Sequence, residues 1–234
     1  MLAGQAVAGP PYLTDDPQPT DEGHWEIYNF ATGSHDRSGL DGEAGLDLNY
    51  GGAKDLQLTA VLPLAFDNPE GSSGEGFRAG GGVIELAVKS KIVHADDESW
   101  VPDVSVFPRV FVPTDHRFGT GHVSLFLPVW AEKDFGPWQV FGGGGYQINP
   151  GADQRNFWQG GIAANRTISK SLQLGAEVYG QTRDTVDGPG YVALNFAATI
   201  KVTEHWSILA SAGPSWEQGG ADGQVFYLAL KADY

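Results

Sequence analysis

Apolar and polar residues alternate in short segments along almost the entire chain, and turn residues separate these segments. Between Leu56 and Leu64 every second residue is Leu or Ala, while Gln57 and Thr59 stand among the residues between them. The pattern returns in 172–178 and in many other segments, and no segment shows sustained helical periodicity. A period of two places successive side chains on opposite faces of a β-strand. The sequence therefore predicts an all-β fold.

Twelve such segments are expected, and two kinds of connection take turns between them. Short connections recur at 52–54, 96–98, 134–137, 169–170 and 203–204, whereas longer, glycine-rich connections lie between them. Short turns at one end and longer loops at the other are typical of an outer-membrane barrel, and an even strand count brings both termini to the periplasmic side. We expect a single antiparallel up-and-down transmembrane β-barrel of a bacterial outer membrane, monomeric and with twelve strands. The expected strands cover 24–33, 42–51, 55–66, 78–93, 99–112, 120–133, 138–148, 155–168, 171–182, 190–202, 205–213 and 223–234.

Composition excludes several classes of function. The net charge of −15 opposes binding to nucleic acid, which requires clustered Lys and Arg. The absence of cysteine excludes disulfides and thiolate metal sites, and the six histidines never stand at ligand spacing. We expect neither a cofactor nor a metal. The competing fold is a soluble β-sandwich or β-barrel, whose strands also alternate. The polar faces of this chain, however, carry more charge and glycine than a solvent-exposed face of such a fold requires.

The last segment carries a specific signal. Phe226, Leu228, Leu230, Ala232 and Tyr234 alternate on one face, and the chain stops at the aromatic residue. A terminal aromatic on an alternating strand resembles the signal recognised by the machinery that inserts outer-membrane barrels. We therefore expect the barrel-assembly machinery and outer-membrane lipid to be partners of this chain.

Aromatic residues near the short turns predict a membrane girdle. Trp130, Trp138, Trp206 and Tyr234 are expected at the level of the lipid headgroups, where aromatic belts lie.

The faces opposite the apolar ones are expected to line a lumen. Twelve strands enclose a space wider than the filled interior of an eight-stranded barrel and narrower than a large porin. The charged residues expected there are either structural ion pairs or a selective constriction, and we expect a mixture of both. These lumen residues are Asp47, Glu85, Lys89, Lys91, Asp103, Arg109, Glu177 and Lys201.

The N-terminal 1–22 is separated from the barrel at 23–234 by its composition. Residues 6–8, Ala-Val-Ala, have the form of a signal-peptidase site, so 1–22 is interpreted as a signal remnant followed by a Pro- and Asp-rich segment. We expect this segment to be a solvated tail. The alternative is a stopper that enters the lumen against Lys89, Lys91 and Arg109.

Several motifs resemble an outer-membrane family labelled as transporters and related to the "MetA-pathway of phenol degradation" proteins. They are the run 9–17, Gly-Pro-Pro-Tyr-Leu-Thr-Asp-Asp-Pro, then 23–26, 119–122, 127–130, 142–146 and 149–151. The resemblance implies an outer-membrane barrel associated with uptake of small, often aromatic or hydrophobic, compounds. It implies no functional residues.

One motif favours catalysis instead. His122 and Ser124 have the His-x-Ser spacing of outer-membrane lipid hydrolases, where a His deprotonates a Ser. Those enzymes need the pair on the lipid face, whereas Leu125 and Leu127 occupy that face here and turn the pair inward. A purely structural barrel is a further alternative. We expect a non-enzymatic channel or facilitator for passive passage of small solutes, hydrophobic or aromatic ones among them.

Overall fold

The alternating segments form β-strands in a computed structural model that describes residues 10–70, 76–96, 99–218 and 222–234. No helix long and apolar enough to span a membrane occurs among these residues. The strand segments are β1 (Trp25–Asp36), β2 (Gly39–Ala53), β3 (Leu56–Pro69), β4 (Arg78–Gly81), β5 (Val83–Val93), β6 (Asp103–Val106), β7 (Arg109–Pro113), β8 (Ser124–Phe135), β9 (Trp138–Ile148), β10 (Phe157–Ser169), β11 (Leu172–Gln181), β12 (Tyr191–Lys201), β13 (Trp206–Glu217) and β14 (Asp222–Asp233).

These segments make twelve strands of one ring, because two of the strands are interrupted. β4 and β5 both pair with β3, one after the other along its length, and only Gly82 separates them. β6 and β7 likewise both pair with β5 and β8, with a break at Phe107–Pro108. All pairings in the ring are antiparallel, and every pair except the closing pair of β1 with β14 joins strands that follow one another in the chain. The predicted twelve-stranded up-and-down barrel is confirmed.

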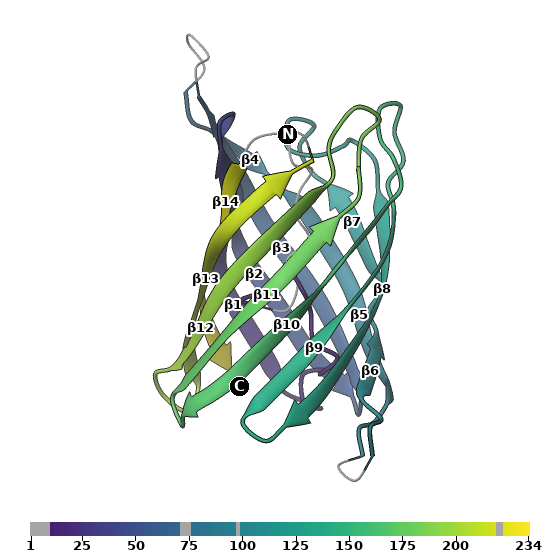
Figure 1. Ribbon diagram of the computed structural model, residues 1–234. Coiled ribbons are helices and arrows are strands. Elements are labelled where there is room, and N and C mark those ends of the chain that lie inside the picture. Colours follow the sequence, from purple (N-terminus) through teal and green to yellow (C-terminus); the bar gives the residue numbers. More distant parts are fainter. Residues whose placement is uncertain (1–9, 71–75, 97–98, 219–221) are drawn as a thin grey trace.

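The ring closes between the first and the last strand. β1 pairs with β2 on one side and with β14 on the other, from Glu26↔Asp233 to His35↔Gln224. The Trp25 N–H donates to the Tyr234 carbonyl at 2.7 Å, and the Tyr234 N–H returns a bond of 3.0 Å. No open sheet edge remains between these two strands, which is the condition for backbone polar groups to cross a hydrocarbon layer. Figure 1 shows the resulting cylinder of tilted strands.

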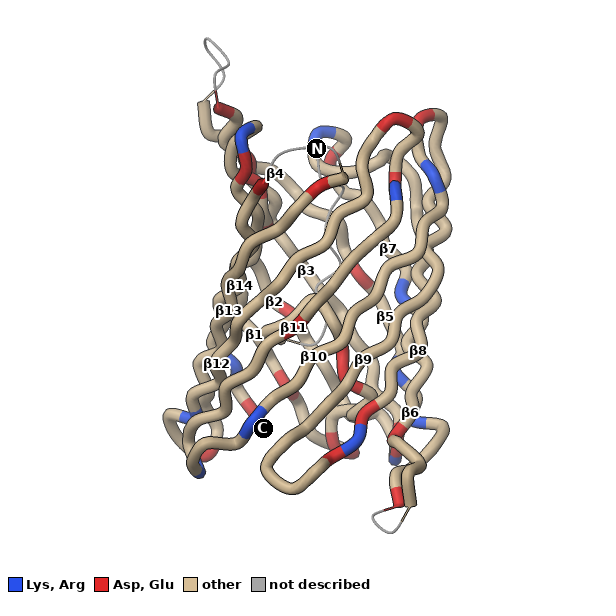
Figure 2. The backbone as a smooth tube through the Cα atoms, in the orientation of Figure 1, with Lys and Arg blue, Asp and Glu red and all other residues tan. Residues whose placement is uncertain are grey.

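The apolar faces point outward and the polar faces inward. Leu64 is 65% exposed and Ile162 is 58% exposed, whereas Glu177 on β11 is only 1% exposed. In Figure 2 many charged residues lie toward the two ends of the barrel. Of those along the strands between the ends, Glu85, Lys89 and Arg109 are buried and therefore face the interior. An apolar band around a polar interior is the reverse of a soluble barrel and fits a lipid surround.

The first outer connection is shorter than the sequence predicted. The expected loop at 34–41 is mostly strand, because β1 runs to Asp36 and β2 begins at Gly39. Gly39 adopts φ +132°, which an L-residue rarely adopts, so glycine permits the chain to reverse within two residues. The register then continues without interruption from Asp36↔Gly39 down both strands.

Trp130 does not belong to the membrane girdle, and that prediction is wrong. Along β8 the residues Phe126, Trp130 and Glu132 share the inward face, because their spacing is even. Trp130 is 1% exposed and packs in a cluster with Phe107, Phe111, Phe126 and Ala87. Its indole lies over Gly143 of β9, its cross-strand partner, where a Cβ would meet the ring at 3.1 Å. Glycine therefore makes room for the largest side chain of the interior.

Candidate functional site

The N-terminal segment 10–22, which we call the plug, lies inside the barrel. It enters at the short-turn end, where Glu22 bridges to Gly51 of β2, and then runs into the lumen. Thr14, Asp15 and Pro17 are among the most deeply buried residues of the protein. The expectation of a solvated tail is therefore wrong for these residues, and the stopper alternative is correct. The predicted signal site at 6–8 lies outside the described residues.

Asp15 of the plug meets two cations of the wall. Its carboxylate accepts a bond of 2.9 Å from Lys89 Nζ and another from Arg109 Nη2. Arg109 also lies 3.5 Å from Glu85, and Lys89 lies 3.6 Å from Asp16. Asp15, Lys89 and Arg109 are almost fully buried, so each needs its partners to offset lost hydration.

The ring of Phe107 supports this cluster from the wall. The guanidinium carbon of Arg109 lies 4.2 Å from the ring centroid, and Lys89 Nζ lies 4.9 Å from it. Phe107 stands in the break between β6 and β7, so its position is not set by the regular strand ladder. Cations over an aromatic face in a dry site are stabilised by the ring quadrupole.

Glu177 of β11 holds the tip of the plug. Its two carboxylate oxygens accept backbone N–H bonds from Leu13 at 3.0 Å and Thr14 at 2.6 Å. Asn195 Nδ2 on β12 donates to the same carboxylate at 2.6 Å. A carboxylate that receives several charge-assisted bonds is a strong anchor for backbone N–H groups that have no strand partner.

Tyr12 and Pro11 complete this anchor. The Tyr12 hydroxyl bonds to Asn165 of β10, and its ring packs edge-on against Phe141 with centroids 5.6 Å apart. The Ser211 hydroxyl donates to the Pro11 carbonyl at 2.5 Å. The Tyr12 hydroxyl sits directly above Gly175, where a side chain would collide with it.

Gln18 anchors the plug near the short-turn end. Its amide nitrogen donates at 2.8 Å to both Asp103 and Glu132, while its oxygen accepts from Lys91 Nζ at 2.6 Å. Lys91 also forms an ion pair of 3.2 Å with Asp103. Thr20 N–H donates to Gln57 Oε1 at 2.8 Å. Plug and wall therefore share one polar network across the lower half of the lumen.

The structure brings together most of the predicted lumen residues but not all of them. Lys201 is exposed at the last residue of β12, beside the turn at Ser171, and lies away from the cluster. Its strand position has the inward parity, but the barrel wall ends there. Asp47 is buried and accepts 2.8 Å from Asn49. The predicted residues that lie inside the wall are Asp47, Glu85, Lys89, Lys91, Asp103, Arg109 and Glu177.

The remaining girdle residues lie at the short-turn end and point outward. Trp138 begins β9 and Trp206 begins β13, both at short turns. The ring of Tyr234 contacts Trp206 edge-on with centroids 6.4 Å apart and stacks with His205 at 6.0 Å. Their role as a headgroup belt stays a prediction.

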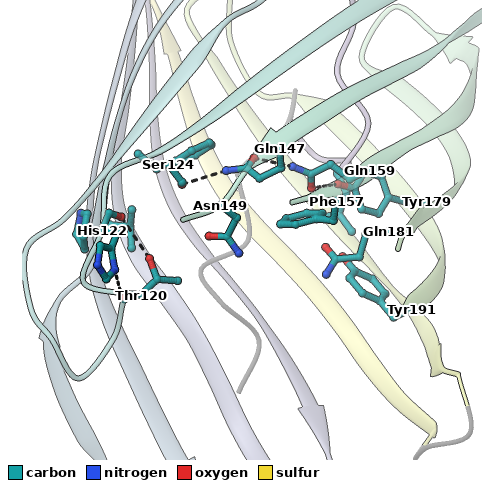
Figure 3. Close-up of a pocket in the computed structure, with 15 residues that line it drawn as sticks. Thr120, His122, Ser124, Gln147, Asn149, Phe157, Gln159, Tyr179, Gln181 and Tyr191 are labelled. Carbon is teal, nitrogen blue, oxygen red and sulfur yellow. Dashed lines mark hydrogen bonds between the residues drawn. The ribbon is translucent and has the colours of Figure 1, made fainter. Parts of the chain in front are cut away.

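Beyond the plug tip, toward the longer loops, the lumen holds a small outer cavity of about 50 Å³. Leu13 of the plug forms part of its floor, and aromatic and amide side chains form its wall (Figure 3). Its described lining contains no Asp, Glu, Lys or Arg. The lining residues are Leu13, Val83, Phe111, Pro113, Gly119, Thr120, His122, Ser124, Gln147, Asn149, Phe157, Gln159, Tyr179, Gln181 and Tyr191.

A chain of hydrogen bonds crosses the wall of the outer cavity. Tyr179 OH donates to Gln159 at 2.6 Å, Gln159 donates to Gln147 at 3.2 Å, and Gln147 donates to Ser124 at 3.0 Å (Figure 3). These groups come from the adjacent strands β11, β10, β9 and β8. The alternation along these strands turns Gln147, Gln159 and Tyr179 inward, but no local signal in the sequence distinguishes this neutral half from the charged half below.

His122 and Ser124 are not arranged as a base and its nucleophile. His122 Nδ1 lies 3.0 Å from the Thr120 carbonyl in the loop that precedes β8, and Ser124 Oγ accepts from Gln147. Figure 3 shows the two side chains apart on the cavity wall.

In the loop that precedes β8, Arg117 donates to Asp115 and lowers the pKa of that carboxyl to about 2.

Comparisons with known proteins support the fold. No protein-family model matches the sequence, and no curated protein matches it significantly. An outer membrane channel from Pseudomonas putida F1 is 15% identical with a TM-score of 0.72, over 97% of this chain and 99% of that chain. The translocator domain of the autotransporter NalP from Neisseria meningitidis is 9% identical with a TM-score of 0.55, over 89% and 87%. The fold is thus that of outer-membrane β-barrels, and the resemblance to the phenol-pathway family stays a prediction.

Proposed function

We propose that this protein is an outer-membrane channel for passive passage of small uncharged solutes, aromatic ones among them. The observation that carries the proposal is the outer cavity. Its aromatic faces, together with amide and hydroxyl groups and no charged lining residue, suit a neutral ring that bears a hydrogen-bonding group. The short-turn end, where β1 begins and β14 ends, would face the periplasm, and the longer loops would face outward.

The plug blocks direct passage in this state. Asp15, Glu177 and Gln18 each tie it to a different part of the wall, so the route below the cavity is filled. A solute that enters the outer cavity crosses the lower lumen only when the plug moves. The filled lower lumen explains how a membrane can hold a polar lumen of this width and still remain closed to small solutes.

The test is conductance of the refolded protein in a planar bilayer, compared with a variant that lacks residues 10–20. We expect infrequent or small steps from the complete chain and large, regular steps from the shortened chain. A heat-modifiable gel shift confirms that both are folded barrels. If the shortened barrel conducts no more than the complete one, an occluded channel is excluded.

Solute class is tested on the same shortened variant. We expect phenol and benzyl alcohol to reduce the open current more than benzoate does, because the outer cavity offers no cation to a carboxylate. The variant Gln159→Ala, which removes the centre of the hydrogen-bond chain, should weaken block by phenol. Equal block by benzoate would contradict a preference for uncharged solutes.

The alternative of a lipid hydrolase is not favoured, since His122 Nδ1 lies against the Thr120 carbonyl and not at the Ser124 hydroxyl, which accepts a bond from Gln147. The C-terminal strand, whose Leu228 and Leu230 point outward, is also proposed as the segment recognised during assembly.

A further inference from the structure

A groove on the outside of the barrel, at the loop end, combines an apolar floor with basic edges. Val192 of β12 and Trp216 of β13 are cross-strand partners, 46% and 44% exposed, and face away from the lumen. The connection after β11 and the segment before β10 supply the remaining walls. We call this surface the rim groove, lined by Arg155, Asn156, Gln181, Thr182, Arg183, Gly190, Tyr191, Val192, Trp216, Glu217 and Gln218.

Two arginines stand at this groove, and hydrogen bonds fix the segments that carry them. The Arg155 N–H donates to the Asp184 carbonyl at 2.7 Å, and the Thr182 N–H donates to the Trp158 carbonyl at 2.9 Å. The segments of Arg155 and Arg183 are therefore joined side by side, and both side chains are exposed. Within the described part of the chain neither guanidinium forms an ion pair, in contrast to Arg78, Arg109 and Arg117.

The charge of the groove is unusual for this protein. The whole chain carries −15, yet two cations and one carboxylate, Glu217, line the groove. Arginine presents a planar fork of donors that matches phosphate oxygens, and it is more weakly hydrated than lysine. An apolar floor next to such donors fits a molecule with both an acyl chain and a phosphate.

We propose that the rim groove binds a phosphorylated glycolipid of the outer leaflet. Arg155 and Arg183 hold a phosphate, an acyl chain lies on Val192 and Trp216, and Glu217 accepts a hydroxyl from the sugar. The inference rests on the membrane placement of the proposed function but not on conductance, because Arg155, Arg183, Val192 and Trp216 do not line the outer cavity.

The experiment measures lipid binding by native mass spectrometry of the refolded protein in detergent micelles. The probe is bis-phosphorylated lipid A, and its dephosphorylated form serves as the comparison ligand. We expect the complete protein to retain one lipid A, and Arg155→Gln with Arg183→Gln together to weaken retention at least tenfold. Both changes remove the charge and leave a shorter polar side chain that still donates hydrogen bonds.

Arg166→Gln is the matched control. Arg166 is an exposed arginine at the other end of β10, over the ring of Trp138 with its guanidinium carbon 5.3 Å from the ring centroid. Its replacement should leave lipid A binding unchanged. The proposal is overturned if the double variant binds as the wild type does, if Arg166→Gln weakens binding equally, or if the dephosphorylated lipid binds as tightly. The conductance of the double variant should equal that of the wild type. The lipid-binding proposal and the channel proposal can therefore fail independently of each other.

Discussion

Asp15 has the most demanding surroundings of any residue in the plug. Its side chain is 2% exposed and accepts hydrogen bonds from both Lys89 and Arg109. Lys89 also lies near Asp16, and Arg109 also lies near Glu85. Removal of one partner from a buried ion pair leaves an uncompensated charge and costs about 3–5 kcal/mol. Asp15 therefore makes a large contribution to the stability of the plug inside the lumen.

We predict that Asp15→Asn releases the plug. The chain contains no cysteine, so Thr14→Cys introduces a single thiol whose reaction with a charged maleimide reports exposure of the plug. Thr14 contributes its backbone N–H to Glu177, and in the described structure its hydroxyl has no hydrogen-bond partner, so the replacement is mild. Asp15→Asn should raise the labelling rate at least tenfold, equivalent to about 1.4 kcal/mol.

Asp21→Asn supplies the control for that experiment. Asp21 belongs to the same segment but is exposed at the barrel entrance. Its replacement removes the same charge without a buried partner, so the labelling rate should stay near that of the parent. Equal acceleration by both changes would show that net charge, not the buried cluster, retains the plug.

At the scale of the strand, β8 illustrates how parity determines the cost of a substitution. Trp130 fills the space between Phe126 and the interrupted strand β6–β7, so Trp130→Ala leaves a cavity. Large-to-small changes of this kind cost about 3–5 kcal/mol. We predict a clear fall in the urea midpoint of the gel-shifted barrel.

Trp206→Ala is the comparison, since Trp206 lies on the outer surface and its neighbours lose no packed core. It should lower the midpoint by much less than Trp130→Ala does. If Trp206→Ala lowered the urea midpoint more than Trp130→Ala does, the packing of Trp130 in the interior would be contradicted.

Alternation alone was enough to predict which strands form and which way most side chains point. Glu177 was placed inside because its neighbours in sequence are apolar, and Lys89 because Leu86 and Val88 occupy the opposite parity of its strand. The same rule assigns Trp130 to the interior, but aromatic character near a short turn favoured the girdle, and the preference was wrong. Composition is a weaker guide than parity where the two disagree.

The plug was beyond what local pattern could predict. Asp15 contacts residues 74 and 94 positions away, and Leu13 contacts Glu177 across 164 positions. An acidic, proline-rich segment has the composition of a solvated tail. Only the finished lumen, which brings Lys89 and Arg109 together from different strands, determines where that segment goes.

For the whole molecule, the two kinds of connection predict its orientation in the cell. In cells that express Asp187→Cys, in the connection between β11 and β12, a membrane-impermeant maleimide should label the protein. Lys170→Cys, in the two-residue turn between β10 and β11, should react only after the outer membrane is permeabilised. Labelling of Lys170→Cys alone in intact cells would reverse the orientation proposed here.

The pairing of β1 with β14 also determines when the lumen comes into existence. The plug precedes β1, but the groups that hold it lie on strands as late as β11, β12 and β13. A chain that assembles from its first strand to its last has no interior until the final strand meets the first. The plug is thus made before every strand of the barrel, but its binding site is complete only after the last strand has paired with the first. A newly closed barrel is therefore open until the plug enters it.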